Sequence, residues 1–116
     1  DRELMVLGTA IPKTFDLSYV TLNEYTGSER HVVVPPALQT IGHGAFKHNE
    51  KIEAVVLPGC LQVIEYEAFQ GCKNLRVIHI PDSVRRIEFK AFEGCEALET
   101  IVKNICYENA KIYFEL

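Results

Sequence analysis

The sequence predicts an α/β repeat solenoid, in which short parallel strands and short helical turns form coils that pack only against their neighbours. Two observations predict this fold class. Three blocks of 23 residues, 32–54, 55–77 and 78–100, align without a gap, and the same residue types return at the same places in each block. The recurring positions are Pro35, Pro58 and Pro81, then Ile41, Ile64 and Ile87, then Ala45-Phe46, Ala68-Phe69 and Ala91-Phe92, and finally Ile52, Leu75 and Leu98.

The composition is that of one ordinary globular domain. The 116 residues are 47% apolar and 24% charged, with a net charge of −4, and these values are typical of such domains. The longest run of Lys or Arg is Arg85-Arg86. Because binding to a phosphate backbone needs a larger basic patch, nucleic acid is not expected as a partner. No apolar run approaches the roughly 18–20 residues that a membrane helix requires, so membrane insertion is not expected either.

Residues 1–31 are predicted to form an N-terminal cap. Ile11-Pro12 lies 23 residues before Val34-Pro35, which indicates a degenerate coil, but the isoleucine and phenylalanine of the pattern do not follow it. We therefore expect a strand or hairpin over Leu17–Glu24 that covers the first coil. The apolar stretch Leu4–Ile11 is short and has acidic flanks, whereas a signal peptide has a basic one. It is not interpreted as a signal peptide.

The third block shows how one coil begins. Ile78 and Ile80 alternate with His79, which is the period-2 pattern of a half-buried strand. Pro81 cannot donate a hydrogen bond to a sheet ladder, so it ends the strand and a turn follows. The apolar residues after the turn are expected to point inward, with Arg85-Arg86 outside.

The same block then supplies the centre of the core. Ala91 and Phe92 form a compact pair of a small and a large side chain, and Gly94 ends that turn. The phenylalanines of the three coils, Phe46, Phe69 and Phe92, are predicted to stack as a column. An aromatic at a fixed spacing also fits a ligand-binding box, but packing is the favoured interpretation, and no cofactor is required.

The pattern resembles the BspA-like class of leucine-rich repeats. The resemblance covers about three fifths of the chain, and the first block departs from it only by carrying Asn49 where the others have Cys. It implies a right-handed leucine-rich-repeat coil. It also implies a bacterial surface or secreted protein, so an extracellular or cell-surface location, that binds host or neighbouring-cell molecules. The family brings no catalytic residues. The matching positions are Leu57-Pro58, Leu61, Ile64, Ala68-Phe69, Cys72 and Leu75, and then Ile80-Pro81, Val84, Ile87, Ala91-Phe92, Cys95 and Leu98.

The cysteines show neither CxxC nor Cys/His spacing, so no metal site is predicted. Cys72 and Cys95 lie one period apart, and Asn49 holds the equivalent place in the first block. A side chain that hydrogen-bonds the backbone suits such a fixed point. A disulfide between the two cysteines is geometrically conceivable, but buried free thiols are the favoured interpretation.

Residues 101–116 are predicted to be a partial repeat or C-terminal cap. Lys103 and Asn104 replace the apolar-proline pair, so the coil geometry is expected to change there. Ile112–Phe114 is interpreted as a closing strand.

The outward residues of the predicted strands are the candidate partner-binding site. Their apolar character is unusual, because exposed sheet faces normally carry polar residues. A protein-binding strip explains it, and so does cover by the tail or by a second copy of the chain; the two explanations carry equal weight. The candidate residues are His31, Val33, Val56, Val77, His79 and Val102.

A second candidate is an aromatic column formed by His43, Tyr66 and Phe89. Aromatic rows serve as protein interfaces and as stacking platforms for sugars, so a glycan is a possible ligand. The favoured interpretation is that these rings flank the core at a corner of the coil. Three nearby carboxylates could serve general acid–base catalysis, but such groups are far more often solvated surface charges. They are Glu65, Glu67 and Glu88.

The sequence thus favours a non-enzymatic module that recognises a protein of the host, the bacterial surface or the matrix through its strand face. One alternative is a structural spacer, or a self-associating unit, of a larger surface protein. An enzyme with a reactive thiol or a carboxylate pair is the least favoured alternative.

Overall fold

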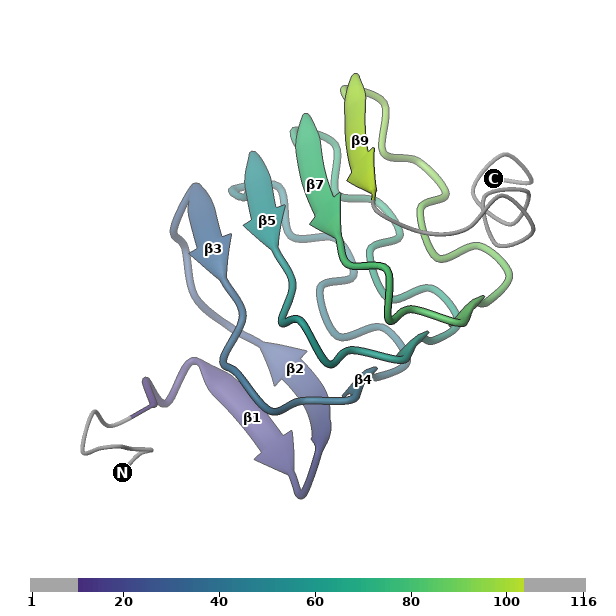
Figure 1. Ribbon diagram of the computed structural model, residues 1–116. Helices are drawn as coiled ribbons and strands as arrows, with labels where there is room; N and C mark the ends of the chain where they lie inside the picture. The colour runs from purple at the N-terminus through teal and green to yellow at the C-terminus, as the bar shows by residue number, and fades with distance from the viewer. Residues whose placement is uncertain (1–10, 104–116) are drawn as a thin grey trace.

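Two sheets run along a solenoid in the computed structural model, which describes residues 11–103 (Figure 1). The first is a four-stranded sheet in the order β3-β5-β7-β9, with every pair parallel. His31 pairs with Ala54, Ala54 with Val77, and Val77 with Thr100, so each step equals the 23-residue period of the sequence. Its strands are β3 (His31–Val33), β5 (Ala54–Val56), β7 (Val77–Ile80) and β9 (Thr100–Lys103).

The second sheet has five strands in the order β1-β2-β4-β6-β8. Three of its strands contain only two residues each, one per coil, and they pair in parallel at the same 23-residue step. The sequence analysis treated their isoleucines simply as inward residues, because two residues are too few to display a strand pattern. The strands are β1 (Phe15–Ser18), β2 (Thr21–Tyr25), β4 (Thr40–Ile41), β6 (Val63–Ile64) and β8 (Arg86–Ile87).

A hairpin covers the N-terminal end of the five-stranded sheet. β1 and β2 pair antiparallel, and β2 then lies parallel to β4 with Leu22 opposite Ile41. That register steps 19 residues, so the hairpin is not a regular coil. Tyr25 places its ring 5.3 Å from that of Phe46 and so takes the place of a core phenylalanine. The apolar stretch Leu4–Ile11, apart from its last residue, lies outside the described residues.

The predicted aromatic column forms the centre of the core. The rings of Phe46 and Phe69 stack at 4.7 Å with 8° between their planes, and those of Phe69 and Phe92 at 5.2 Å with 2°. All three side chains are buried. The spacing follows from the parallel register, which places equivalent residues of adjacent coils above one another. The prediction that these rings pack rather than line a ligand box is confirmed.

The short helical turns predicted from the sequence do not form in residues 11–103, which contain strands and turns only. Two causes are visible. The amide groups of Phe46 and Phe69 donate to carbonyls of the next coil, at 2.7 and 2.8 Å, instead of to a helix ladder. In addition, Gly44, Glu67 and Lys90 have φ of 65°, 59° and 62°, a left-handed conformation that interrupts a helix. Bonding between coils therefore replaces helical bonding.

A second left-handed position recurs four residues later. Gly71 and Gly94 occupy it with φ of 75° and 79°, and His48 occupies it in the first coil with φ of 61°. The left-handed φ favours glycine at this position, and at Gly71 a Cβ atom would in addition meet the ring of His48.

The predicted side-chain anchor at the Asn/Cys position is confirmed. Asn49 Nδ2, Cys72 Sγ and Cys95 Sγ each donate to a main-chain carbonyl of the preceding segment, at 3.3, 3.0 and 3.1 Å. Both cysteines are free thiols. The neighbouring Cys95 thiol and, after it, burial raise the pKa of the Cys72 thiol. An equivalent anchor that the sequence analysis missed lies nearby, where Cys60 and Ser83 donate to carbonyls one coil back.

Beyond Lys103, the predicted closing strand Ile112–Phe114 and Cys106 lie outside the described residues. β9 itself keeps the parallel register of its neighbours as far as Lys103. The division into a cap over 1–31, coils over 32–100 and a terminal segment over 101–116 stays a prediction.

Candidate protein-binding face

The outward side of the four-stranded sheet, called here the strand face, carries two columns of predicted site residues. Val33 is 70% exposed and Val56 41% exposed, and His79 is also exposed. The inward residues of the same strands, Val32, Val55 and Ile78, are buried in the core. The alternation along each three- or four-residue strand therefore aims one set of side chains at the core and the other at solvent.

The register between adjacent strands aligns the predicted residues in the two columns. Val33 lies opposite Val56, Val56 opposite His79, and His79 opposite Val102 on β9. The neighbouring column begins with His31, which is exposed, and continues through Ala54 and Val77, which are half-buried. Val77 thus presents less surface than the sequence pattern suggests.

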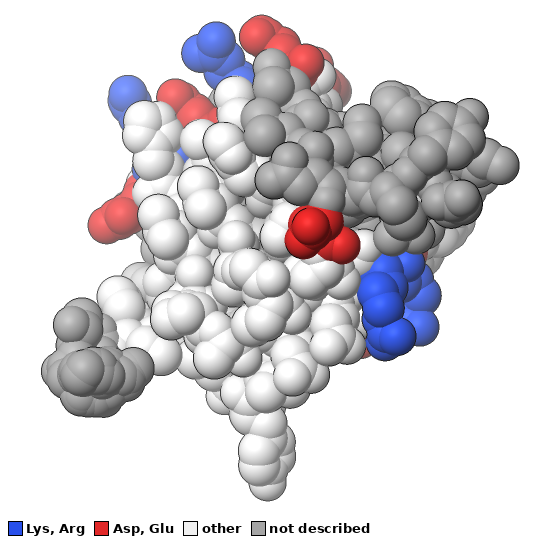
Figure 2. All heavy atoms as spheres, in the orientation of Figure 1, with Lys and Arg blue, Asp and Glu red and all other residues white. Residues whose placement is uncertain are grey.

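The strand face is bordered by charge but carries little of its own. Figure 2 shows uncharged side chains over most of the middle of the view, with one acidic group near the centre and the other charged side chains toward the upper and right-hand edges. At the residue before each strand, Arg30 lies 3.9 Å from Glu53, and Arg76 lies 3.8 Å from Glu99. These exposed pairs link adjacent coils beside an apolar strip.

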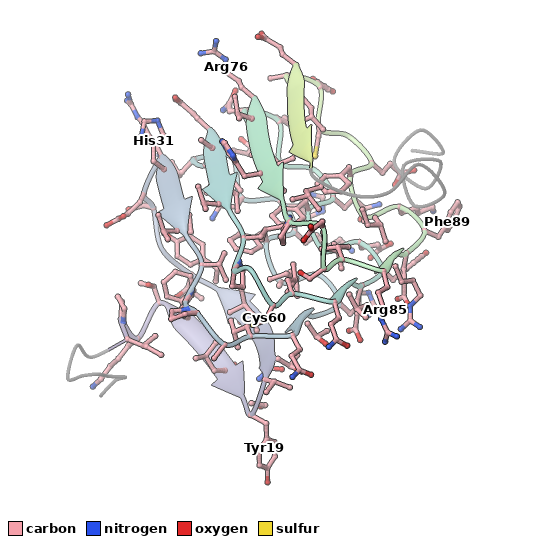
Figure 3. All side chains as sticks on the ribbon, viewed as in Figure 1. Tyr19, His31, Cys60, Arg76, Arg85 and Phe89 are labelled. Atoms are coloured by element: carbon pink, nitrogen blue, oxygen red, sulfur yellow. The ribbon has the colours of Figure 1, made fainter. Side chains whose placement is uncertain are left out.

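The aromatic column lies on the five-stranded side of the coil and is held from within. The rings of His43 and Tyr66 meet edge to face at 5.2 Å, and those of Tyr66 and Phe89 stack at 6.0 Å. Phe89 is 67% exposed and Tyr66 half-buried, with Lys90 Nζ 5.4 Å from the centre of the Phe89 ring. Figure 3 shows Phe89 at the edge of the molecule, well away from His31. These rings pack on one another, as the coil-corner interpretation expects, and because Phe89 stays exposed a glycan contact at this column stays a prediction.

Two of the three candidate carboxylates have a structural task. Glu65 Oε1 accepts a hydrogen bond from the main-chain N–H of His43 at 3.1 Å, and Glu88 Oε1 accepts one from Tyr66 at 3.2 Å. Glu65 and Glu88 are one period apart, so the same contact recurs in successive coils. This regularity was not recognised in the sequence analysis, although the 23-residue alignment of the two glutamates is its signal.

The third carboxylate, Glu67, forms ion pairs. Its Oε1 lies 2.8 Å from Lys47 Nζ and 3.4 Å from His43 Nε2. The hydrogen bond from Lys47 is the main reason why the pKa of Glu67 is lowered from its ordinary value. A carboxylate held in its charged form by a lysine is poorly suited to act as a general acid.

Among residues 11–103 no cluster of three or more metal-ligating side chains is present. That same part of the chain also contains no helix with the length and apolar character needed to cross a bilayer.

The chain belongs to the BspA-type leucine-rich repeat family. The family model described as "BspA type Leucine rich repeat region (6 copies)" matches residues 20–113. No curated protein matches the chain.

Two solved structures are similar. The T. pallidum leucine rich repeat protein has 27% identity and a TM-score of 0.76, over 82% of this chain and 50% of its own. A leucine rich cell surface protein from Faecalibacterium prausnitzii has 19% identity and a TM-score of 0.41, over 79% of this chain and 37% of its own. The chain thus spans half the length of the T. pallidum protein, and the two share the leucine-rich-repeat fold.

Proposed function

We propose that the chain is a non-enzymatic recognition module that binds another protein through its strand face, at the surface of a bacterial cell. The observation that carries the proposal is the exposed apolar row through Val33 and Val56, set on a rigid parallel sheet. Apolar side chains in such a row are costly to leave in water, and a partner that covers them gains their burial.

The family supports the proposal, since leucine-rich repeats generally serve protein–protein interaction and BspA-like members are typically bacterial surface proteins. The fold adds a physical reason. Strands β5 and β7 are hydrogen-bonded to a neighbour on each edge, and β3, β5 and β7 each pack one face on the core, so little conformational entropy is lost when a partner binds. Each strand of the four-stranded sheet is only three or four residues long, which fits a contact of modest size. Repetition of such coils in a longer protein would strengthen the binding.

A capture experiment tests this function. The chain is immobilised and exposed to extracts of host epithelium, host matrix and bacterial envelope, beside a variant that carries Val33→Glu and Val56→Glu. We expect a protein partner whose capture falls at least about tenfold in the variant, because two charges would be buried without partners.

Val20→Glu is the matched control, because Val20 is 40% exposed, like Val56, but lies in the hairpin turn away from the strand face. Equal capture by the native chain and the Val33/Val56 variant, with both folded, would refute binding through this face.

The alternative is that the chain is a spacer or a self-associating unit of a larger surface protein. The observation in favour is that the matched part of the chain covers 50% of the T. pallidum protein. Under this alternative no foreign protein is captured, and the chain recovers only itself.

A further inference from the structure

The thiols of Cys72 and Cys95 are neighbours between the second and the third coil. Cys95 Sγ donates to the carbonyl oxygen of Phe69 at 3.1 Å, and the same oxygen accepts the main-chain N–H of Cys72 at 3.2 Å. The sulfur of Cys95 is therefore held beside the backbone of Cys72. Each thiol is also the main influence on the pKa of the other, which is raised for Cys72 and lowered for Cys95. These two observations place the sulfur atoms close together.

The register of the coils gives the two residues a spacing that a disulfide accepts. The residues are one 23-residue period apart, and the strands before and after them pair at this same step, Val63 with Arg86 and Val77 with Thr100. Adjacent coils are therefore separated by about 4.8 Å, the spacing of paired strands. A disulfide needs a Cα–Cα distance of about 4.4–6.8 Å, and the main chain already meets this requirement.

The two thiols point in the same direction, toward the N-terminal end of the solenoid. Cys72 Sγ donates to Phe46 C=O at 3.0 Å, and Cys95 Sγ makes the equivalent bond one coil later. Cys95 is thus already directed at the coil of Cys72. A bond between the sulfurs requires the side chain of Cys72 to rotate away from Phe46. The hydrogen bond given up in this rotation is a weak one, because a thiol is a weak donor.

The two residues differ in their access to solvent. Cys72 is fully buried, whereas Cys95 is half-buried. Cys95 also has the lowered pKa, so it is the more readily ionised thiol, and the thiolate is the form that reacts with oxidants. A small oxidant therefore reacts with Cys95 first, while Cys72 stays protected beside it.

We propose that Cys72 and Cys95 are a redox pair that closes to a disulfide when the chain meets hydrogen peroxide. In the first step the Cys95 thiolate attacks a peroxide oxygen and the O–O bond breaks. Hydroxide leaves and takes up the proton that Cys95 has lost, and Cys95 becomes a sulfenic acid. In the second step the sulfur of Cys72 attacks the sulfur of Cys95, the S–O bond breaks, and the Cys72 proton leaves with the hydroxyl group as water. Two thiols thus lose two electrons, and the peroxide is reduced to two molecules of water.

The disulfide would join the second coil to the third by a covalent bond. It closes a loop of one 23-residue period, and such a link stabilises a fold mainly by restricting the unfolded chain. Both cysteines lie outside the strands, so the proposal stands whether or not the strand face binds a foreign protein.

The test is peroxide oxidation of a variant that carries Cys60→Ser and Cys106→Ser, so that only the two proposed thiols remain. We expect an intact mass that is lower by two hydrogen atoms. Titration with Ellman's reagent should show that both free thiols have been lost, and dithiothreitol should restore them.

Single variants on this background assign the two roles. With Cys72→Ser, the Cys95 sulfenic acid meets no second thiol, and we expect the mass to rise by one oxygen atom in a product that dimedone traps. With Cys95→Ser, the remaining thiol is buried, and its oxidation should be at least about tenfold slower. Serine keeps a donor for the carbonyl one coil back, so it is the mildest replacement. Equal oxidation rates in the two variants would contradict the order of the steps.

The native chain provides a second readout that needs no substitution. After oxidation the remaining free thiols are alkylated with iodoacetamide, and trypsin then cuts after Lys73 and so separates the two cysteines. We expect a pair of peptides linked through Cys72 and Cys95. Linkage of either residue to Cys60 instead, or linkage between two chains, would overturn the proposal.

Two other results would also overturn it. Oxidation of Cys95 to a sulfinic acid, while Cys72 stays a thiol, would show that the two sulfurs do not meet. Survival of both thiols at a peroxide dose that fully oxidises the exposed Cys60 of the native chain would show that the pair is shielded from the oxidant.

Discussion

The molecule contains two aromatic columns three residues apart in the sequence, and the structure gives them opposite roles. Phe46, Phe69 and Phe92 are buried and stack with nearly parallel planes. His43, Tyr66 and Phe89 recur with the same 23-residue period, yet the column is half-buried in the middle and exposed at Phe89.

The comparison teaches that the period identifies a column but not its environment. Three residues along the turn are enough to rotate a side chain from the core to the surface. A periodic aromatic pattern is therefore evidence for stacking in either case, and the ring's neighbours decide whether stacking stabilises the fold or leaves surface for a partner.

The largest expected effect comes from the buried column. Phe69→Ala removes the central ring, which contacts a ring on each side, and should lower the free energy of unfolding by about 4 kcal/mol. Urea denaturation followed by circular dichroism measures this loss. Because a domain of this size has only about 5–15 kcal/mol in total, Phe69→Leu is run beside it as a milder variant. A loss below about 1 kcal/mol for Phe69→Ala would contradict the packing role.

A smaller effect is expected from the surface column. Tyr66→Ala removes a half-buried ring that contacts two others, and should cost about 1 kcal/mol. Phe89→Ala removes a ring that is 67% exposed and should change stability by less than about 0.5 kcal/mol. The same denaturation experiment separates them. If Phe89→Ala destabilised the chain as much as Phe69→Ala, the contrast between the columns would be lost.

The smallest effect is a pH dependence beside the surface column. Because Lys47 lowers the pKa of Glu67 in the folded chain, the charged carboxylate favours folding at neutral pH, and this contribution is lost as the pH falls through the lowered pKa, below 4.5. Melting temperatures of the native chain and Glu67→Gln, measured from pH 7 to pH 3, should differ at neutral pH and converge in acid. A difference that persists unchanged at pH 3 would argue against this linkage.

The sequence predicted the features that each coil repeats. These features follow from residue types that recur at the same position in every coil. They are the 23-residue period, the strand from Val77 to Ile80, the buried phenylalanine column and the anchoring role of Cys72. It also predicted that Val33 and Val56 point outward, because alternation along a strand is a local property. Their role as a binding site stays a prediction.

Only the tertiary structure decided the rest, because those features depend on bonds between coils. The second sheet consists of two-residue strands that exist only when coils stack. The turns are not helical because the amides of Phe46 and Phe69 find carbonyls in the next coil. The carboxylates of Glu65 and Glu88 bind main-chain N–H groups one coil back, a contact that no local pattern specifies. The period determined that the chain stacks, and the stacking determined which hydrogen bonds each residue makes.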